Sequence, residues 1–341
     1  KEAIILAQAQ RNNKQFFEGC QLALDPMITF GLKQIPEKTD EDGPGLPWDS
    51  FTLALTGFTT RNVTGNTARD MIQAMMKSAT KAQWNNWYRR ILIKDLRCGV
   101  SEKTINKVVE KDYADFAIPV FSCQLAKNAD DHPKKLKGWK YLDPKLDGVR
   151  ILSIIDIDTK TVTQYSRDGR QNDRFEHIAN DLAKLIPSLK QSIVLDGEMV
   201  SRNFQELMKQ LNRKENVDTK DAKLALFDIV PLVDFLAGEC KMSQRDRQDV
   251  LVGFIPLLKE HCGERVYVIP KKAIDLDTPE GQAEFKQFNN ETVAAGYEGI
   301  MIKDPAATYR TKRTDAWLKM KPFITVDLEV IGLEEGTGRN K

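Results

Sequence analysis

The chain has 341 residues, of which 41% are hydrophobic and 29% are charged, and its formal net charge is only +2. This length exceeds one ordinary core, so two domains with part of a third are expected, and the composition excludes a disordered chain. The small net charge excludes nucleic-acid binding by bulk charge, so any such binding requires local basic surfaces.

Residues 1–127 are expected to form an all-helical domain. Apolar residues recur at helical spacing from Ala3 onward, and again in segments 52–58 and 68–76. A loop rich in proline, glycine and acidic residues, 37–49, separates the first helices from the later ones.

Helix ends in this region are candidate phosphate sites. Thr80 is expected to cap a helix that ends at Cys98-Gly99, and Ser101 is expected to cap the next one. A helix N-terminus beside Lys103 offers backbone N–H groups to a phosphate oxygen. The candidate DNA contacts are Gly65 and Asn66, in a second tight turn, with Arg89, Arg90, Lys94, Arg97, Gly99, Ser101 and Lys103. A plain helical bundle with a solvated charged face is the alternative.

A linker is expected at 128–138, and the next domain, 139–324, has short strands with helices between them. Strands are expected at 149–155, 161–166, 192–200, 223–230, 266–269, 299–303 and 316–321, and helices at 174–186, 203–212, 243–260 and 280–295. This pattern predicts an α+β domain with mainly antiparallel sheets. No glycine-rich phosphate loop is present, so a nucleotide must be held in another way.

The hexapeptide Lys145–Arg150 sets a lysine before an Asp-Gly turn and a strand. A lysine acts as a nucleophile only after it loses its proton, and partial burial with nearby cations lowers a lysine pKa by about 2–3 units. The same hexapeptide is also compatible with an ordinary surface turn.

Further motifs follow in the same domain. They are Ser166-Arg167-Asp168-Gly169, Asp196-Gly197-Glu198, Phe227 with Asp228 in a strand, Glu298-Gly299 before a strand, and Trp317 to Lys321. In the last, alternation points Lys319 and Lys321 to one face and Leu318 and Met320 to the other. Lysines aimed toward a nucleophilic lysine are costly unless an anion lies between them, and a triphosphate is such an anion. Each motif alone also fits a strand with one exposed charge or a core phenylalanine.

Taken together and in this order, these motifs resemble those of the covalent nucleotidyltransferases: DNA ligases, RNA ligases and mRNA capping enzymes. Segments 96–101 and 55–66 are similar to the helical DNA-binding domain of ATP-dependent DNA ligases, most like the compact viral kind. Segment 309–313, running into Trp317, is also DNA-ligase-like. The NAD-dependent ligases are disfavoured because their zinc cysteines are missing.

The resemblance implies a role for each motif. Lys145 would attack the α-phosphorus of ATP and form lysyl-AMP. The other implied contacts are Phe227 stacked on adenine, Asp143 at the adenine amino group, Glu198 at the ribose, Arg150 and Arg167 at ribose or phosphate, Lys319 and Lys321 at the α-phosphate, and Arg313 at the nick phosphate. Glu298, with Glu198, would hold Mg²⁺, since carboxylate oxygens suit a hard cation.

The implied partner is nicked duplex DNA, bound by a monomer during replication and repair. A sliding-clamp partner is possible but not readable from the sequence. Residues 325–341 resemble the start of an OB-fold domain whose remainder, with its cationic motif, is expected to be absent. Two alternatives stay open: an RNA ligase or capping-type nucleotidyltransferase, and a non-catalytic DNA-binding protein.

A cytoplasmic location, in the host cytoplasm for a viral protein, is expected. The five scattered cysteines include no Cys-x-x-Cys pair, and the three histidines stand apart, which disfavours a zinc ribbon and a disulfide framework. No apolar run is long enough to span a membrane, and no signal-peptide pattern begins the chain.

Overall fold

A computed structural model describes residues 1–32, 34–201, 219–322 and 332. The chain divides into two compact units, each made of separate segments. Unit 1 comprises 1–125, 148–269 and 306–313, and unit 2 comprises 126–147, 270–305 and 314–341. The structure therefore groups the chain differently from the contiguous 1–127 and 139–324 domains of the sequence analysis.

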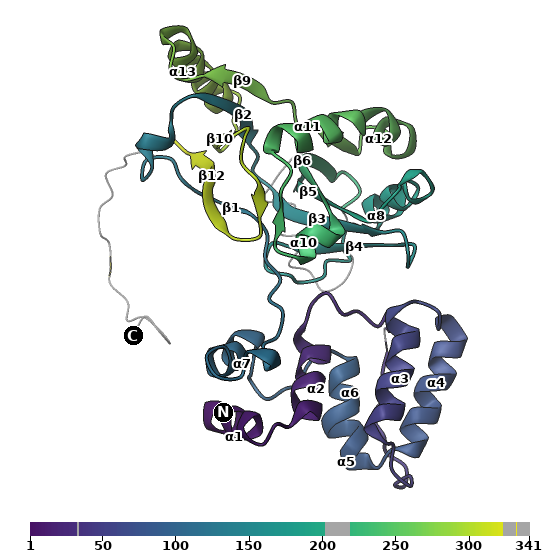
Figure 1. The fold of residues 1–341 in the computed structure, drawn as a ribbon. Coiled ribbons are helices and arrows are strands. Elements are labelled where there is room, and N and C mark those ends of the chain that lie inside the picture. The colour runs from purple at the N-terminus through teal and green to yellow at the C-terminus, as the bar shows by residue number, and fades with distance from the viewer. Residues whose placement is uncertain (33, 202–218, 323–331, 333–341) are drawn as a thin grey trace. The chain divides into compact units, whose positions relative to one another are not determined.

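The first part of unit 1 is helical (Figure 1). Its helices are α1 (Glu2–Gln10), α2 (Lys14–Leu24), α3 (Trp48–Thr59), α4 (Gly65–Ser78), α5 (Lys81–Gln83), α6 (Arg89–Leu92) and α7 (Glu102–Val109), with a π turn at Trp84–Tyr88 and a 3-10 turn at Ala114–Phe116. Helices α3, α4 and α6 pack around the fully buried Phe51, Phe58 and Trp84, while α1 and α7 pack in a second cluster with Phe17 of α2.

Both predicted caps are confirmed. Thr80 and Ser101 each accept a hydrogen bond from the third residue of the following helix, within a reciprocal capping box. The helix after Thr80 ends earlier than predicted, at Leu92 rather than at Cys98-Gly99. It ends because Lys94 has a left-handed backbone, with φ of 55°, which a continuing helix does not allow.

The second part of unit 1 is built on a sheet of strand order β4-β3-β5-β6-β8. The strands are β3 (Val149–Asp156), β4 (Thr161–Ser166), β5 (Ile193–Val200), β6 (Lys223–Pro231) and β8 (Val266–Val268). All neighbours are antiparallel except β6 and β8, which pair in parallel, so this mixed sheet is mainly antiparallel, as the sequence predicted. A short two-stranded sheet pairs β7 (Glu239–Cys240) with β11 (Tyr309–Arg310).

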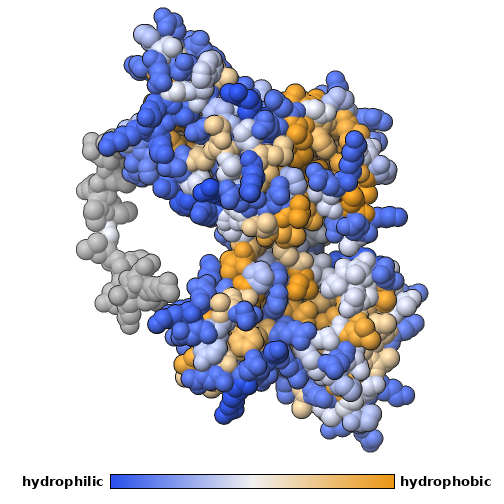
Figure 2. Space-filling model, in the orientation of Figure 1, coloured by the Kyte–Doolittle hydropathy of each residue, from blue (hydrophilic) through white to orange (hydrophobic). Residues whose placement is uncertain are grey.

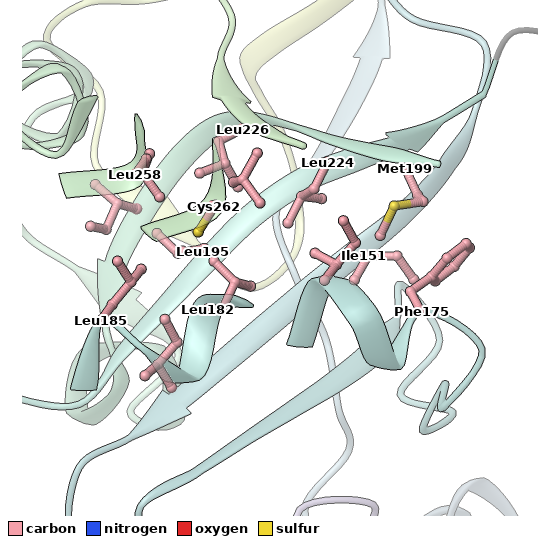
Figure 3. Packing of buried hydrophobic residues seen from close by; sticks show 14 of the residues in the cluster. Ile151, Phe175, Leu182, Leu185, Leu195, Met199, Leu224, Leu226, Leu258 and Cys262 are labelled. Atoms are coloured by element: carbon pink, nitrogen blue, oxygen red, sulfur yellow. The ribbon is translucent and has the colours of Figure 1, made fainter. Parts of the chain in front are cut away.

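Helices cover one face of this sheet. They are α8 (Glu176–Ala183), α11 (Gln244–Gly253) and α12 (Ile255–Cys262), with a 3-10 turn at Ile186–Ser188. The short helix α10 (Leu232–Leu236) instead packs Phe235 against Phe121 and Tyr309. Leu182 of α8 and Leu258 of α12 are packed in one cluster with Leu195, Leu224 and the other inward side chains of β5 and β6 (Figure 3). The helix predicted at 203–212 lies outside the described residues.

Unit 2 is a second five-stranded sheet, of order β1-β12-β10-β2-β9. Its strands are β1 (Leu125–Asn128), β12 (Arg313–Met320), β10 (Gly299–Lys303), β2 (Trp139–Lys145) and β9 (Lys272–Asp275). Helix α13 (Pro279–Ala294) packs Phe285 and Phe288 against a buried cluster that includes Leu142, Ile300 and Leu318. The surface seen over α13 is hydrophilic (Figure 2). Residues 128–138, expected to be a linker, connect β1 to β2 and contain the 3-10 turn Pro133–Lys135.

The segment 325–341, expected to begin an OB-fold, lies outside the described residues apart from Gly332. In the described part of the chain, no helix has the length and apolar character needed to cross a membrane. All five cysteines are free thiols.

Candidate active site

One face of the unit 2 sheet is polar, and strand register sets its composition. Lys145 lies opposite Gly299, and Asp143 lies opposite Met301, which in turn lies opposite Lys319. Alternate residues of a strand point to opposite faces, so these residues lie on the face away from the Leu142, Ile300 and Leu318 cluster. We call Asp143, Lys145, Lys303 and Lys319, with Glu298 and Lys321 at its end, the polar face of unit 2.

The predicted alternation in β12 is confirmed. Leu318 is buried and Met320 packs against the apolar cluster, which leaves Lys319 for the other face. The glycine that follows Glu298 is required here. Gly299 has φ of 140°, and a Cβ atom at this position would collide with the Met320 carbonyl oxygen.

Glu298 lies between two lysines. One carboxylate oxygen accepts a hydrogen bond from Lys145 Nζ, and the other accepts one from Lys321 Nζ. The backbone N–H of Glu298 also donates to the Lys145 carbonyl oxygen at 3.1 Å. The side chains of Lys145 and Glu298 are 22% and 29% exposed, so both remain reachable by a ligand. The structure therefore brings together the nucleophile candidate, the metal-ligand candidate and Lys321.

Asp143 is more enclosed than the sequence suggested. Its Oδ2 accepts a hydrogen bond from Lys303 Nζ at 2.9 Å, and both side chains are at most 2% exposed. The Lys303 ammonium also lies 4.7 Å from the centre of the Trp317 ring. Lys303 was not singled out from the sequence, because its partner is 160 residues away.

Unit 1 also has a polar face, but its charges are paired and buried. Arg150 donates to both carboxylate oxygens of Asp196, at 2.9 and 2.6 Å, and to the Gln124 carbonyl oxygen at 2.7 Å. The Tyr309 hydroxyl donates to Asp196 Oδ2 at 2.9 Å. We call Arg150, Asp196, Tyr309 and Gln124 the buried network of unit 1.

The pKa directions of this network follow from burial and charge. Burial alone would lower the pKa of Arg150, but the Asp196 carboxylate outweighs it and holds this pKa well above its usual value. Burial, together with the same carboxylate, raises the pKa of Tyr309. Both groups therefore keep their protons at neutral pH. The sequence offered Arg150 as a ligand for ribose or phosphate, and the structure gives its guanidinium three protein acceptors.

Phe227 lies at a β-bulge. Asp196 pairs with Asp228 and Gly197 pairs with Leu226, so Phe227 has no opposite residue in β5. Bulges change the direction of a side chain and are frequent beside active sites. The ring lies 5.4 Å from the Arg150 guanidinium carbon. Glu198, two residues after Asp196 in β5, is partly exposed on the same side of the sheet as Asp196.

The sequence did not indicate that Arg247 and Tyr309 are buried and contact carboxylates in unit 1. Arg247, on α11, donates to both oxygens of Asp228 at 2.8 and 3.1 Å, and its side chain is 1% exposed. It also donates to the Ala307 carbonyl oxygen at 3.4 Å, which ties segment 306–313 to this helix. Tyr309, in that segment, was noted only for its place in a motif. Neither arginine nor tyrosine at these positions gives a local signal of burial.

The remaining phosphate candidates of this unit are both exposed. The Arg167 side chain is 66% exposed, and its Nε lies 3.7 Å from Asp168. Arg313, at the start of β12, is also exposed. Both remain accessible to a ligand.

Two basic candidates of the helical region, Lys94 and Arg89, have structural partners. Lys94 Nζ donates to the carbonyl oxygens of Leu22, Asp25 and Ile28 at 3.1, 2.6 and 2.7 Å. Burial lowers the pKa of Lys94 to about 8, and Asp25 opposes that shift. Arg89 Nε donates to the Ile35 carbonyl oxygen at 2.9 Å, and its Nη1 lies 3.1 Å from Glu37. Arg90 differs, because its Nη1 is buried with no hydrogen-bond partner among the described residues. Lys94 is therefore corrected from a candidate DNA contact to a group that satisfies the carbonyls around the end of α2.

The other candidates of this region are open to solvent. Gly65, with φ of 58°, and Asn66 begin α4 and are exposed. Lys103 is exposed in the first turn of α7, after the capping Ser101. The Arg97 side chain is 66% exposed and its Nε lies 3.3 Å from Asp95, and Gly99 accepts a hydrogen bond from Lys1 Nζ at 3.1 Å.

The two expected metal ligands lie in different units, Glu198 in unit 1 and Glu298 in unit 2. Across the described ranges of the chain, no three acidic, histidine or cysteine side chains cluster closely enough to hold a metal ion on their own.

Comparison with known proteins supplies the family. Residues 123–321 match the model of the ATP-dependent DNA ligase domain, which is more than half of the chain. DNA ligase 2 of Methanosarcina acetivorans is 31% identical over 248 residues, covering 65% of this chain and 39% of that protein. The DNA ligase of Archaeoglobus fulgidus is 29% identical over 259 residues, covering 70% of this chain and 42% of that protein. The chain thus spans less than half the length of either relative.

A solved structure, Pmar-Lig_PreS3, is 45% identical with a TM-score of 0.66, and the match covers 100% of this chain and 78% of that one. The similarity extends beyond residues 123–321 and includes the helical part of unit 1. The family match, the lysine at the edge of a polar sheet face and the order of the motifs agree: this chain belongs to the family of ATP-dependent DNA ligases.

Proposed function

We propose that this protein seals nicks in duplex DNA, in replication and repair, at the expense of ATP. The observation that carries the proposal is the contact of Glu298 with both Lys145 and Lys321, at the end of a sheet face that also presents Lys319. A single lysine on a surface needs no such setting. A lysine that attacks a triphosphate needs this setting, because the phosphate charge must be neutralised and the amine must be held in line with the bond that breaks.

In the first step, the Lys145 amine forms a bond to the α-phosphorus of ATP. The bond from that phosphorus to the bridging oxygen breaks, and pyrophosphate leaves with the electron pair. Lys321 and Lys319 would hold the α-phosphate, where negative charge is redistributed as the bonds change. The Glu298 carboxylate, which contacts the Lys145 ammonium, is positioned to orient the amine before the attack.

Mg²⁺ fits this arrangement as a cation shared with the substrate. It commonly binds through one or two carboxylates together with substrate phosphates, rather than in an all-protein cage. Glu298, which is partly exposed, can supply such a carboxylate, with Glu198 as the second candidate. When bound, Mg²⁺ neutralises phosphate charge.

For the nucleotide, we assign Phe227 to the adenine ring and Glu198 to the ribose hydroxyls. The bulge at Phe227 supports this assignment, since a core phenylalanine in a regular strand needs none. Arg150 then acts beside the ring rather than as a free phosphate ligand.

AMP passes from Lys145 to the 5′-phosphate of the nick, and the 3′-hydroxyl displaces AMP to form the phosphodiester bond. Arg167 and Arg313 are the candidates for the nick phosphate.

For the DNA, we assign the exposed helix starts at Gly65-Asn66 and Ser101-Lys103, with Arg97, to the duplex backbone. These contacts carry no sequence information, as a nick-sealing enzyme requires. The protein acts as a monomer in this proposal.

The test is a transfer of label. Full-length protein is incubated with α-labelled ATP and Mg²⁺ and separated under denaturing conditions, and a labelled band at the protein's mass is expected. A nicked duplex added afterwards should remove the label and yield sealed DNA. Labelling by GTP, or sealing of RNA ends in preference to DNA, would favour an RNA ligase or a capping enzyme instead. A protein that binds nicked DNA but never takes up label would be a non-catalytic binder.

A further inference from the structure

Segment 306–313 belongs to unit 1, although the strands before and after it, β10 and β12, are in the sheet of unit 2. Backbone hydrogen bonds attach it to unit 1. The Ala307 carbonyl oxygen accepts one from the Gln244 N–H at 2.8 Å, and the Thr311 N–H donates to the Gly238 carbonyl oxygen at 3.0 Å. Between these two points, β11 pairs with β7. The segment therefore has a defined conformation on unit 1.

Tyr309 is the buried anchor of this segment. Its side chain is fully buried, and its hydroxyl donates to Asp196 Oδ2 at 2.9 Å and accepts from the Gln124 N–H at 3.3 Å. The ring lies 5.5 Å from the Arg247 guanidinium carbon. A hydrogen bond to a buried carboxylate is strong and depends on geometry. This hydroxyl therefore fixes where the segment lies on unit 1.

The residues around this anchor expose a group of cations. Arg310, Lys312 and Arg313 are exposed in the segment, and Lys241 is exposed directly after β7, the strand that pairs with β11. We call these four residues the cationic strip. Glu239 pairs with Arg310 at 3.0 Å, and their side chains are 39% and 48% exposed. Four cations beside this one carboxylate give the strip a positive charge, which suits the repeated phosphates of a nucleic acid.

We propose that the cationic strip contacts phosphates of the nicked duplex, and that Tyr309 is the positioning residue that holds the strip in place. This inference rests on the proposed function, because it takes nicked DNA as the substrate. It adds Lys241, Arg310 and Lys312 to the contact of Arg313. Because the Tyr309 hydroxyl is buried, it acts on the DNA only through the segment that carries the cations.

The first test removes single charges from the strip. Affinity of the full chain for a nicked duplex is measured by fluorescence anisotropy at several salt concentrations. Lys241→Met and Lys312→Met should each reduce the slope of log affinity against log salt by about one unit. Both should form lysyl-AMP at the wild-type rate. Lys286→Met, which removes an exposed lysine of α13 in unit 2, is the matched control and should keep the wild-type slope.

The second test removes only the buried hydroxyl. Tyr309→Phe is loaded with labelled AMP, and single-turnover sealing is followed at varied concentrations of nicked DNA. Rates are normalised to the lysyl-AMP content, so the fraction that folds does not enter. The half-saturating concentration of nicked DNA should rise about three- to thirtyfold, while lysyl-AMP formation and the limiting rate stay unchanged. Tyr88→Phe, which removes a buried hydroxyl that donates to the Leu46 carbonyl oxygen at 2.7 Å, should leave that concentration unchanged.

A combined variant tests whether Tyr309 acts through the strip. When Lys241, Lys312 and Arg313 are all replaced by Met, adding Tyr309→Phe should have little further effect on the half-saturating concentration. An undiminished effect would show that the hydroxyl is structural only, and equal losses of sealing and lysyl-AMP formation in Tyr309→Phe would show the same. Unchanged salt slopes in Lys241→Met and Lys312→Met would remove the strip from the DNA surface. In each of these cases ligation stands and the inference falls, whereas a wild type that forms no lysyl-AMP would overturn the proposed function itself.

Discussion

The buried network of unit 1 and the Glu298 end of the polar face of unit 2 both pair carboxylates with cationic side chains, but at different depths of burial. In unit 1, Arg150 and Asp196 pair in bidentate geometry, and Asp196 is fully buried. In unit 2, Glu298 contacts Lys145 and Lys321, but all three side chains are between 22% and 47% exposed. Charges that satisfy one another in the interior maintain geometry, whereas charges that remain accessible can exchange partners with a substrate. Burial, not residue type, separates the two tasks.

The largest effect is expected at Lys145, and it should leave the fold unchanged. Lys145→Ala should abolish covalent AMP transfer, because no other group supplies the amine. Lys145→Arg should be equally inactive, since a guanidinium stays protonated. Transfer is measured with α-labelled ATP, and folding by thermal denaturation. Labelled AMP on either variant at the wild-type level would remove Lys145 from the mechanism.

The contrast between buried and accessible charges is tested by removing one carboxylate from each unit, Asp196 from unit 1 and Glu298 from unit 2. Asp196→Ala should lower the free energy of unfolding by about 3–5 kcal/mol, because Arg150 is left buried without its anion. Glu298→Ala should lower it by at most about 1 kcal/mol, as for other partly exposed pairs, but should abolish lysyl-AMP formation. Both are measured by urea unfolding. Equal destabilisation by the two substitutions would contradict the distinction drawn between the regions.

A smaller effect is expected at Phe227, which lies beside Arg150 of the buried network and is the proposed contact of the adenine ring. Phe227→Ala should raise the KM for ATP about ten- to a hundredfold, which corresponds to about 1–3 kcal/mol of lost ring contact. Phe227→Leu should recover part of that loss. Steady-state adenylation at varied ATP provides the measurement, and an unchanged KM in Phe227→Ala would mean that this ring only packs the sheet.

The smallest effects separate buried from exposed lysines of the helical region. Lys94→Met should lower the free energy of unfolding by about 1–3 kcal/mol, since three carbonyl oxygens lose their donor. It should leave the salt dependence of nick binding unchanged. Lys103→Met should do the reverse, with the slope of log affinity against log salt reduced by about one unit. A slope that changes for Lys94→Met but not for Lys103→Met would show that the assignment is wrong.

Local patterns in the sequence determined much of this protein. The caps at Thr80 and Ser101 depend on side chains within three residues of the helix start, so they could be read directly. The alternation around Lys319 depends only on the period of a strand. The motifs, in their order, indicated a ligase, and the match of residues 123–321 to the ATP-dependent DNA ligase domain confirmed the family.

Only the tertiary structure decided which charges are buried. Asp143 accepts a hydrogen bond from Lys303, which is 160 residues away in the sequence, and Asp196 accepts one from Tyr309, which is 113 residues away. Lys94 reads as a surface lysine, yet carbonyls more than 60 residues away surround its ammonium. The bulge that turns Phe227 exists only once β5 and β6 are paired. A residue's partners at long range are set by strand register and helix packing, and no local pattern encodes them.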